Sequence, residues 1–188
     1  MKNTLQHIAS VQSGIYVKPD SFGEIVYLQA NHFNEGGQLN SSLIPNLKKT
    51  NQTERHLLQH GDILFAAKGT KNFAAIYEER NGLCVASSIF MVIRINSDFK
   101  KKISSEFLAW TINSPSTQLW LKNNAIGSAL QSISKVTLLE MEVAVPTIEK
   151  QNAILKINSL RKQERIIQKQ LSDLKEQYIQ QHLLISLK

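Results

Sequence analysis

Cysteine is nearly absent from the sequence, since Cys84 is the only one among 188 residues. A lone cysteine excludes an intramolecular disulfide framework and is typical of a reducing compartment. Long apolar runs are missing too. Residues 1–14 lack the apolar stretch of a signal peptide, and residues 89–95 are interrupted by Arg94 and are too short to cross a bilayer. We therefore expect a cytoplasmic protein with no membrane partner.

The motifs of several enzyme classes are also missing. The sequence contains neither glycine-rich phosphate loop, G-x-x-x-x-G-K-[ST] or G-x-G-x-x-G, no adjacent prolines as in the loop of amino-methyltransferases, and no Glu-x-Lys as in a common nuclease site. His56 and His60 have a spacing that can hold zinc on a helix, but no third ligand is evident, so surface histidines are the better interpretation. Cys84 lies in an apolar stretch and is expected to be a core thiol. We expect no catalytic residue, no metal and no cofactor on this chain.

The composition is that of a folded, basic chain. Hydrophobic residues make up 42% and charged residues 20%, which suits one domain with an appendage. Lysine and arginine number 22 against 15 acidic residues, and the net charge is +7 with a pI near 9.5. This balance favours a nucleic acid or an anionic surface as partner.

Residues 1–146 have the pattern of a strand-rich α+β domain. Turn residues stand at 34–37, 61–62 and 81–82, and residues 40–51 form an irregular polar connection. Short apolar or alternating stretches predict strands at 25–29, 63–67, 73–77, 83–86, 89–95 and 141–145. One helix is predicted over 105–113. A second begins with Ser114 as N-cap and Pro115 at its first position, and it ends before Gly127.

From Thr147, which suits an N-cap, to Lys188 the sequence contains no glycine or proline. Apolar residues follow the three-four spacing of a coiled-coil seam there, at Ile157, Leu160, Ile167, Leu171, Leu174, Tyr178 and Ile185. Glu164 and Gln181 are the two polar residues on this seam. A helix of ~38 residues would be ~57 Å long, so we expect it to pair with a helix of a second copy or of a partner protein. The alternative is a helix, whole or broken in two, that folds back on its own sheet.

Basic and amide side chains gather in the predicted loops. Lys68-Gly69-Thr70-Lys71 is a tight basic loop between two apolar strands, so its tip should be exposed and held by rigid neighbours. Residues 127–128 and 131–132 form a second polar loop. Lysines offer phosphate contacts, and amides can reach base edges. The candidate DNA-binding residues are Lys48, Lys49, Lys68, Thr70, Lys71, Asn72 and Gln131. The alternative for each of them is an ordinary solvated surface.

Six segments in a fixed order resemble one known family. They are residues 5–14 (LQHIASVQSG), 61–69 (GDILFAAKG), 84–90 (CVASSIF), 107–110 (FLAW), 127–128 with 131–134 (GS and QSIS), and 143–146 (VAVP) leading to Gln151 and Ile154. Together they resemble the specificity subunit of type I restriction–modification enzymes over nearly the whole chain. The sequence is similar to a half-length form of that subunit with a single target recognition domain.

The resemblance implies a DNA target recognition domain over residues 1–146 and a long, coiled-coil-type helical spacer and dimerisation region over residues 147–188. The recognition domain would bind one half-site of a bipartite double-stranded DNA target, through variable loops. The subunit itself would be non-catalytic. Its protein partners would be a restriction subunit and a methyltransferase subunit that carries S-adenosylmethionine.

Specificity subunits usually carry two such units in tandem, whereas this sequence has one. A half-length form would need to dimerise, and the C-terminal seam supplies the means. Antiparallel pairing of two copies would predict a palindromic bipartite site. Pairing with a second specificity chain stays open. Two other functions also stay open: a coiled-coil adaptor that binds protein without DNA, and an autonomous enzyme such as a nuclease, which the missing motifs disfavour.

Overall fold

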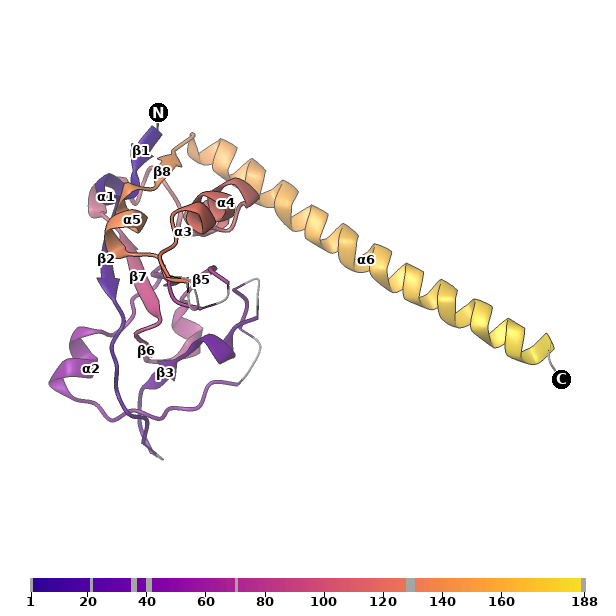
Figure 1. The fold of residues 1–188 in the computed structure, drawn as a ribbon, viewed down its shortest axis with the longest axis horizontal. Coiled ribbons are helices and arrows are strands. Elements are labelled where there is room, and N and C mark those ends of the chain that lie inside the picture. Colours follow the sequence, from indigo (N-terminus) through magenta and orange to yellow (C-terminus); the bar gives the residue numbers. More distant parts are fainter. Residues whose placement is uncertain are drawn as a thin grey trace. The chain divides into compact units, whose positions relative to one another are not determined.

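The computed structural model describes residues 2–20, 22–34, 37–39, 42–69, 71–127 and 131–186. The chain divides into two compact units, Met1–Ile148 and Glu149–Lys188. The first unit is strand-rich and contains both helices and sheets, and the second belongs to one long helix (Figure 1). The predicted fold class is therefore confirmed.

The largest sheet of the first unit has four antiparallel strands in the order β2-β7-β4-β5. They are β2 (Ala9–Ser13), β7 (Phe90–Ile95), β4 (Ile63–Ala66) and β5 (Ala74–Ile76). All four residues of β4 are buried, as expected for an uninterrupted apolar run with partners on both edges. Leu64 stands opposite Val92 on one side and Ala75 on the other, and all three belong to the hydrophobic core.

Two pairs of short strands complete the domain. β1 (Lys2–Thr4) pairs antiparallel with β8 (Glu142–Ala144). β3 (Val26–Leu28) pairs in parallel with β6 (Cys84–Ala86), and every residue of these two strands is buried. Gly14 passes so close to the end of β6 that a Cβ atom there would lie 2.2 Å from the carbonyl oxygen of Ser87. Only glycine permits this approach of two backbones.

The described α-helices of the first unit are α1 (Leu5–Ile8), α2 (Asn51–Arg55), α3 (Ser105–Ile112), α4 (Pro115–Asn123) and α5 (Lys135–Glu140). Short 3-10 helices occupy Ala30–His32, Glu79–Asn81 and Ser97–Phe99. α3 and α4 confirm the two predicted helices, and the hydroxyl of Ser114 accepts a hydrogen bond from the N–H of Thr117 at 3.4 Å. The sequence patterns miss α1, α2 and α5, because four to six residues are too few to show a helical period.

The six predicted strands are present as β3 to β8, each within one residue of its predicted bounds. The patterns miss β1 and β2, whose sequences KNT and ASVQS are mostly polar or small. The turn at 81–82 is confirmed by the φ of 73° at Gly82. It is not a hairpin turn, because β5 pairs with β4 and β6 pairs with β3. Part of the predicted turn at 34–37 lies outside the described residues.

The second unit is formed by α6 (Ile148–Ser186), which runs for 39 residues without interruption (Figure 1). It begins directly after Thr147, the predicted N-cap position, and the alternative of a helix broken in two is wrong. The seven apolar residues predicted for the seam are between 50% and 63% exposed. Among the described helices, α6 included, none combines the length and the apolar composition that a membrane span requires.

Candidate nucleic-acid interface and helical seam

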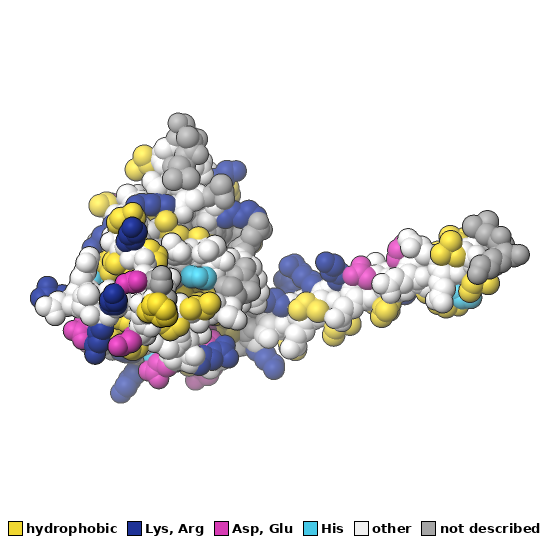
Figure 2. All heavy atoms as spheres, turned by 90° about the horizontal axis from the view of Figure 1, so that it is seen from below, with side chains coloured by type: hydrophobic (Ala, Val, Ile, Leu, Met, Phe, Trp, Pro, Cys, Tyr) yellow, Lys and Arg dark blue, Asp and Glu magenta, His cyan; other side chains and the backbone are white. Residues whose placement is uncertain are grey.

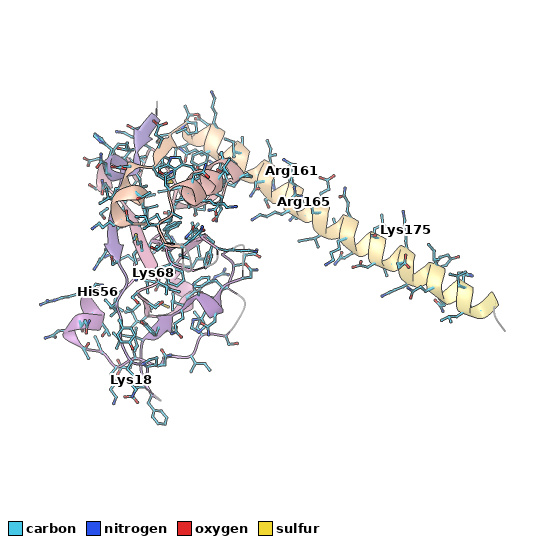
Figure 3. The ribbon with its side chains drawn as sticks, in the orientation of Figure 1. Lys18, His56, Lys68, Arg161, Arg165 and Lys175 are labelled. Carbon is cyan, nitrogen blue, oxygen red and sulfur yellow. The ribbon has the colours of Figure 1, made fainter. Side chains whose placement is uncertain are left out.

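The loop between β4 and β5 carries Lys68. The base of this loop is closed by the N–H of Ala66, which donates to the carbonyl of Phe73 at 2.9 Å. Gly69 has a φ of +132°, a conformation that favours glycine, and apart from its chain neighbours no described residue has an atom within 4 Å of the position that a Cβ would take. Lys68, which is labelled in Figure 3, is an exposed residue of this loop. As predicted, a basic residue is presented to solvent between two buried, apolar strands.

The second predicted polar loop lies against the first. Lys68 and Ser132 stand opposite each other in an antiparallel bridge, and the N–H of Gly69 donates to the carbonyl of Gln131 at 3.3 Å. Ile126 and Ser132 exchange two further backbone hydrogen bonds of 2.9 Å, which close the second loop on itself. Two segments that are distant in the sequence thus form one surface. We name it the Lys68–Gln131 surface and define it by Lys68, Gly69, Gln131 and Ser132.

The charge of Lys68 is open to a ligand. Within the part of the chain that the structure describes, no carboxylate forms an ion pair with Lys68. The side chain of Gln131 is exposed as well. An unpaired cation beside an exposed amide can contact a phosphate and a base edge at neighbouring positions.

The other predicted residues of this loop have different positions. Lys71 is exposed, whereas Thr70 lies outside the described residues. Asn72 is half-buried, and its side-chain amide donates to the carbonyl of Ala66 at 2.8 Å. Asn72 therefore braces the loop from inside, and that donor is already in use.

Lys48 and Lys49 lie on a separate segment, directly before α2. The ammonium of Lys48 is 2.7 Å from the carboxylate of Asp20, and the ammonium of Lys49 is 3.2 Å from that of Glu54. The hydrogen bond to Asp20, and then its charge, raise the pKa of Lys48. A phosphate would have to displace these carboxylates. Both lysines are therefore weaker candidates than Lys68.

An ion pair with a buried carboxylate, at the start of β4, was not predicted. Asp62 is 1% exposed, and Arg94 of β7 donates from Nε and Nη2 to its two carboxylate oxygens at 2.7 and 2.6 Å. The N–H of Gln59 donates to the same carboxylate at 2.8 Å. The hydrogen bond to Asp62 raises the pKa of Arg94. The pair ties β4 to its neighbour and so steadies the strand that carries the Lys68 loop.

The side chains considered above for catalysis or metal binding are two histidines and one cysteine. α2 ends at Arg55, so His56 and His60 do not share a helix, and a ring nitrogen of His56 lies 3.0 Å from the amide of Gln12. Cys84 is buried, and this burial raises the pKa of its thiol to about 12. Among the described residues, no group of three potential ligands could hold a metal ion.

α6 offers an apolar surface beyond the predicted seam. Figure 2 shows hydrophobic side chains along one edge of the helix, with lysines and arginines gathered on its first half. Four apolar residues outside the seam are between 52% and 66% exposed, namely Ile166, Ile179, Leu183 and Leu184. A projection of the sequence on a helical wheel would have found them. The apolar surface is therefore widest near the end of the helix.

Comparison with known proteins identifies the family. The model of the type I restriction modification DNA specificity domain matches residues 16–177. The chain belongs to this family. The match includes most of the first unit and most of α6, so both are parts of the specificity domain. No curated protein matches the chain in sequence.

Solved structures of specificity subunits share this fold. The S subunit from M. genitalium has a TM-score of 0.57 and 15% identity, over 85% of this chain and 38% of that chain. A structure on complex assembly and conformational transition of the type I R-M system has a TM-score of 0.61 and 11% identity, over 87% and 38%. The HsdS subunit from Thermoanaerobacter tengcongensis has a TM-score of 0.60 and 12% identity, over 87% and 37%. The chain spans less than two fifths of each of these chains.

In this specificity domain the candidate residues fall into two groups. Lys68 and Gln131 meet at one surface, with Lys71 on the same loop as Lys68. Lys48 and Lys49 are on another segment and are paired with carboxylates. The assignment of all of them to DNA contacts stays a prediction.

Proposed function

We propose that this chain is a sequence-specific, double-stranded DNA-binding specificity subunit of a type I restriction–modification system. Residues 1–146 would bind one half-site of a bipartite target, and α6 would join a second copy. Methyltransferase and restriction subunits would dock on this assembly. The family match over residues 16–177 carries the proposal. The chain itself would have no catalytic role. S-adenosylmethionine would be bound by the methyltransferase subunit. The assembly would be cytoplasmic.

The Lys68–Gln131 surface has the chemistry for both parts of DNA recognition. Lys68, together with Lys71 of the same loop, can neutralise phosphates, which supplies affinity and register without sequence information. The amide of Gln131 has a donor and an acceptor and can bind adenine bidentately in the major groove. Backbone hydrogen bonds and a bridge join Lys68 and Gly69 to Gln131 and Ser132, so these four residues already lie side by side without DNA.

The exposed seam of α6 supports the pairing of two copies. Exposed apolar residues at coiled-coil spacing gain free energy when they are buried against a second helix. A two-fold related pair would present two recognition domains and would therefore bind a palindromic bipartite site. Ile166, Ile179 and Leu183 would stay outside the seam of such a pair. These three exposed apolar residues would form the surface on which the methyltransferase subunit docks, on the outer side of the paired helices.

A long-read methylome tests the DNA-recognition role directly. The host would be compared with its gene intact, deleted, and carrying Lys68→Ala with Lys71→Ala. We expect one bipartite methyladenine motif to disappear on deletion and to be weakened in the double variant, because two cations that can neutralise phosphates are removed. Lys101→Ala with Lys122→Ala is the matched control, since it removes the same charge at two exposed lysines outside the surface.

The outcomes of the methylome separate the proposal from its alternative. A motif that survives deletion contradicts the specificity role. Tight, salt-tolerant binding of a partner protein without a shift of any DNA probe would then support a coiled-coil adaptor. A motif that disappears on deletion but is unchanged in the folded Lys68→Ala, Lys71→Ala variant removes this loop from the DNA-binding site.

A substitution on the seam tests assembly. Leu171→Glu would place a charge where the helices meet, and we expect it to abolish self-association measured by analytical ultracentrifugation. Ser172→Glu adds the same charge to the next residue, which lies outside the seam, and should leave the dimer intact. Equal association of both variants would show that the seam is not the interface.

A further inference from the structure

The two polar residues on the α6 seam carry information about how two copies pair. Glu164 occupies the heptad position that Leu171 and Tyr178 share, and Gln181 occupies the position that Ile167 and Leu174 share. In an antiparallel coiled coil, a residue of the first kind packs beside a residue of the second kind on the other helix. A polar residue on such a seam costs stability unless it meets a polar partner, and it thereby selects one register.

Within the antiparallel pairing of two copies considered above, we propose the register in which Glu164 of one α6 lies opposite the partner's Gln181. The inference rests on the homodimer of the proposed function. By the two-fold symmetry, the pair of polar residues occurs twice. The same register sets apolar residues opposite one another: Leu171 and the partner's Leu174, Ile167 and the partner's Tyr178, Leu160 and the partner's Ile185.

Other arrangements separate the two polar residues. A shift of the antiparallel register by one heptad sets Gln181 against an apolar residue of the partner, which is Ile157 for a shift in one direction and Leu171 for a shift in the other. A parallel, in-register pair sets Glu164 against the partner's Glu164, and two carboxylates would face each other in the seam. The proposed register is the one among these that gives the carboxylate of Glu164 the amide donor of Gln181.

The distribution of charge along α6 favours the same direction. Between Lys156 and Lys169 there are five basic residues and the one acidic residue Glu164, whereas the segment from Asp173 to Ser186 has two acidic residues and one lysine. A parallel pair would set the two basic halves side by side. An antiparallel pair sets each basic half beside the weakly acidic half of the other helix, which lowers the repulsion.

The register fixes distances that can be measured. The two-fold axis passes between Ser172 and Asp173, and each residue and its copy are separated along the helix by twice their distance from that point. At 1.5 Å per residue, labels at Ser159 would be about 40 Å apart along the helix and labels at Gln180 about 22 Å apart. Both positions are exposed and occupy the same heptad position, so they differ only in their place along the helix.

Spin labels on Ser159→Cys and Gln180→Cys in the full chain test the register by pulsed electron paramagnetic resonance. Cys84 is buried and should stay unlabelled. The two axial distances given above support the proposal. One common distance at both positions means a parallel pair, and a change of about 10 Å at both, in opposite directions, means a register shifted by one heptad; either result overturns the proposal. A chain that is monomeric at every concentration overturns the homodimer itself.

A charge exchange tests the polar pair without a label. Gln181→Glu sets two carboxylates opposite each other twice per dimer, and we expect self-association to weaken by about tenfold or more. Adding Glu164→Lys would then set opposite charges together and restore association. In a parallel pair the double variant would place two lysines opposite each other at position 164 and two glutamates at position 181. Its self-association would then be weaker than that of the wild type and of the single variant. Failure of the double variant to recover overturns the register.

A second feature of α6 is independent of the seam. Four exposed cations near the middle of α6 lie on one face by their helical spacing: Arg161, Lys162, Arg165 and Lys169. Figure 3 labels two of them, Arg161 and Arg165. Within the described chain none of the four forms an ion pair. Neighbours three and four residues apart carry the same charge, which destabilises a helix. A face that serves only solubility would alternate the two signs.

We propose that these four side chains, the α6 basic stripe, bind the phosphate backbone of DNA, and this too rests on the proposed function. Three of the four lie outside the seam positions and their flanks, so pairing leaves them accessible. Between residues 158 and 172 the same face carries Asn158 and Ser172 and no apolar residue. Protein interfaces are depleted in lysine and need an apolar centre, whereas interfaces with DNA are polar and strongly basic. The stripe therefore fits a polyanion.

The salt dependence of DNA binding tests the stripe. The dimeric chain would be titrated with a random-sequence duplex, as wild type and with all four cations replaced by glutamine. We expect the slope of log K against log salt to fall by about 0.9 for each phosphate that the variant no longer neutralises. Lys175→Gln is the control outside the stripe. An unchanged slope in a variant that still dimerises overturns the proposal, and loss of methyltransferase co-purification with an unchanged slope assigns the stripe to a protein contact.

Discussion

The ion pair between Asp62 and Arg94 makes a measurable prediction about the stability of the first unit. Asp62→Asn keeps the size of the side chain but removes the charge that accepts hydrogen bonds of 2.7 and 2.6 Å from Arg94 and one of 2.8 Å from the N–H of Gln59. Breaking a fully buried pair costs about 3–5 kcal/mol. Arg94 is 35% exposed and can regain water, so we expect a loss of about 2–3 kcal/mol.

Urea unfolding followed by tryptophan fluorescence measures this loss. Trp110 and Trp120 both lie in the first unit and report on it alone. With an m value of about 1.5 kcal/mol/M, the midpoint should fall by about 1–2 M. Asp20→Asn is the control, because it neutralises a carboxylate whose pair with Lys48 is exposed and should cost less than about 1 kcal/mol. Equal shifts for the two variants would refute the argument that burial makes the Asp62 pair strong.

Single side chains give three further predictions. Burial raises the pKa of the Cys84 thiol to about 12, so at about pH 8.5, where a free thiol is half ionised, a thiol reagent should label it only after unfolding; rapid labelling of the native chain would contradict its burial. Burial lowers the pKa of His32 from 6.5, and its ring accepts from the N–H of Gln29 at 3.1 Å. Folding favours the neutral ring, so the contribution of His32 to the free energy of unfolding is present above pH 6.5 and is lost as the pH falls. The urea midpoint of His32→Gln should therefore change less with acid than that of the wild type. Gly14→Ala should destabilise the first unit by about 3 kcal/mol or more, because its Cβ would lie 2.2 Å from the carbonyl oxygen of Ser87, and an unchanged melting temperature would show that the two backbones can separate.

Six of the strands and the longer helices of this protein are encoded locally and could be predicted. The apolar run at 63–67 and the alternation at 141–145 each carry the strand period, and Ser114 with Pro115 marks the start of α4. α6 contains no glycine or proline that would end it, and the three-four spacing of its seam residues is evident in the sequence. The short helices and the polar strands β1 and β2 could not be predicted, because they form only where other segments pack against them.

The candidate site was predictable only in part. The sequence identifies Lys68 as a loop residue, because its neighbours on both sides are apolar strands. It cannot show that Asn72 turns inward to the carbonyl of Ala66. The residue type alone does not indicate whether a side-chain amide donates to the backbone or to water. The sequence also cannot show that Lys48 is already paired with Asp20, because the two lie on different segments.

Periodicity and capping act over a few residues, so the strand-rich domain, the long helix and the three-four spacing of its apolar residues could be predicted from the sequence alone. The shared surface of Lys68 and Gln131 and the pairing of Asp62 with Arg94 are visible only in the folded chain. These contacts join segments far apart in the chain, and they depend on the order and register of strands, which no local pattern records.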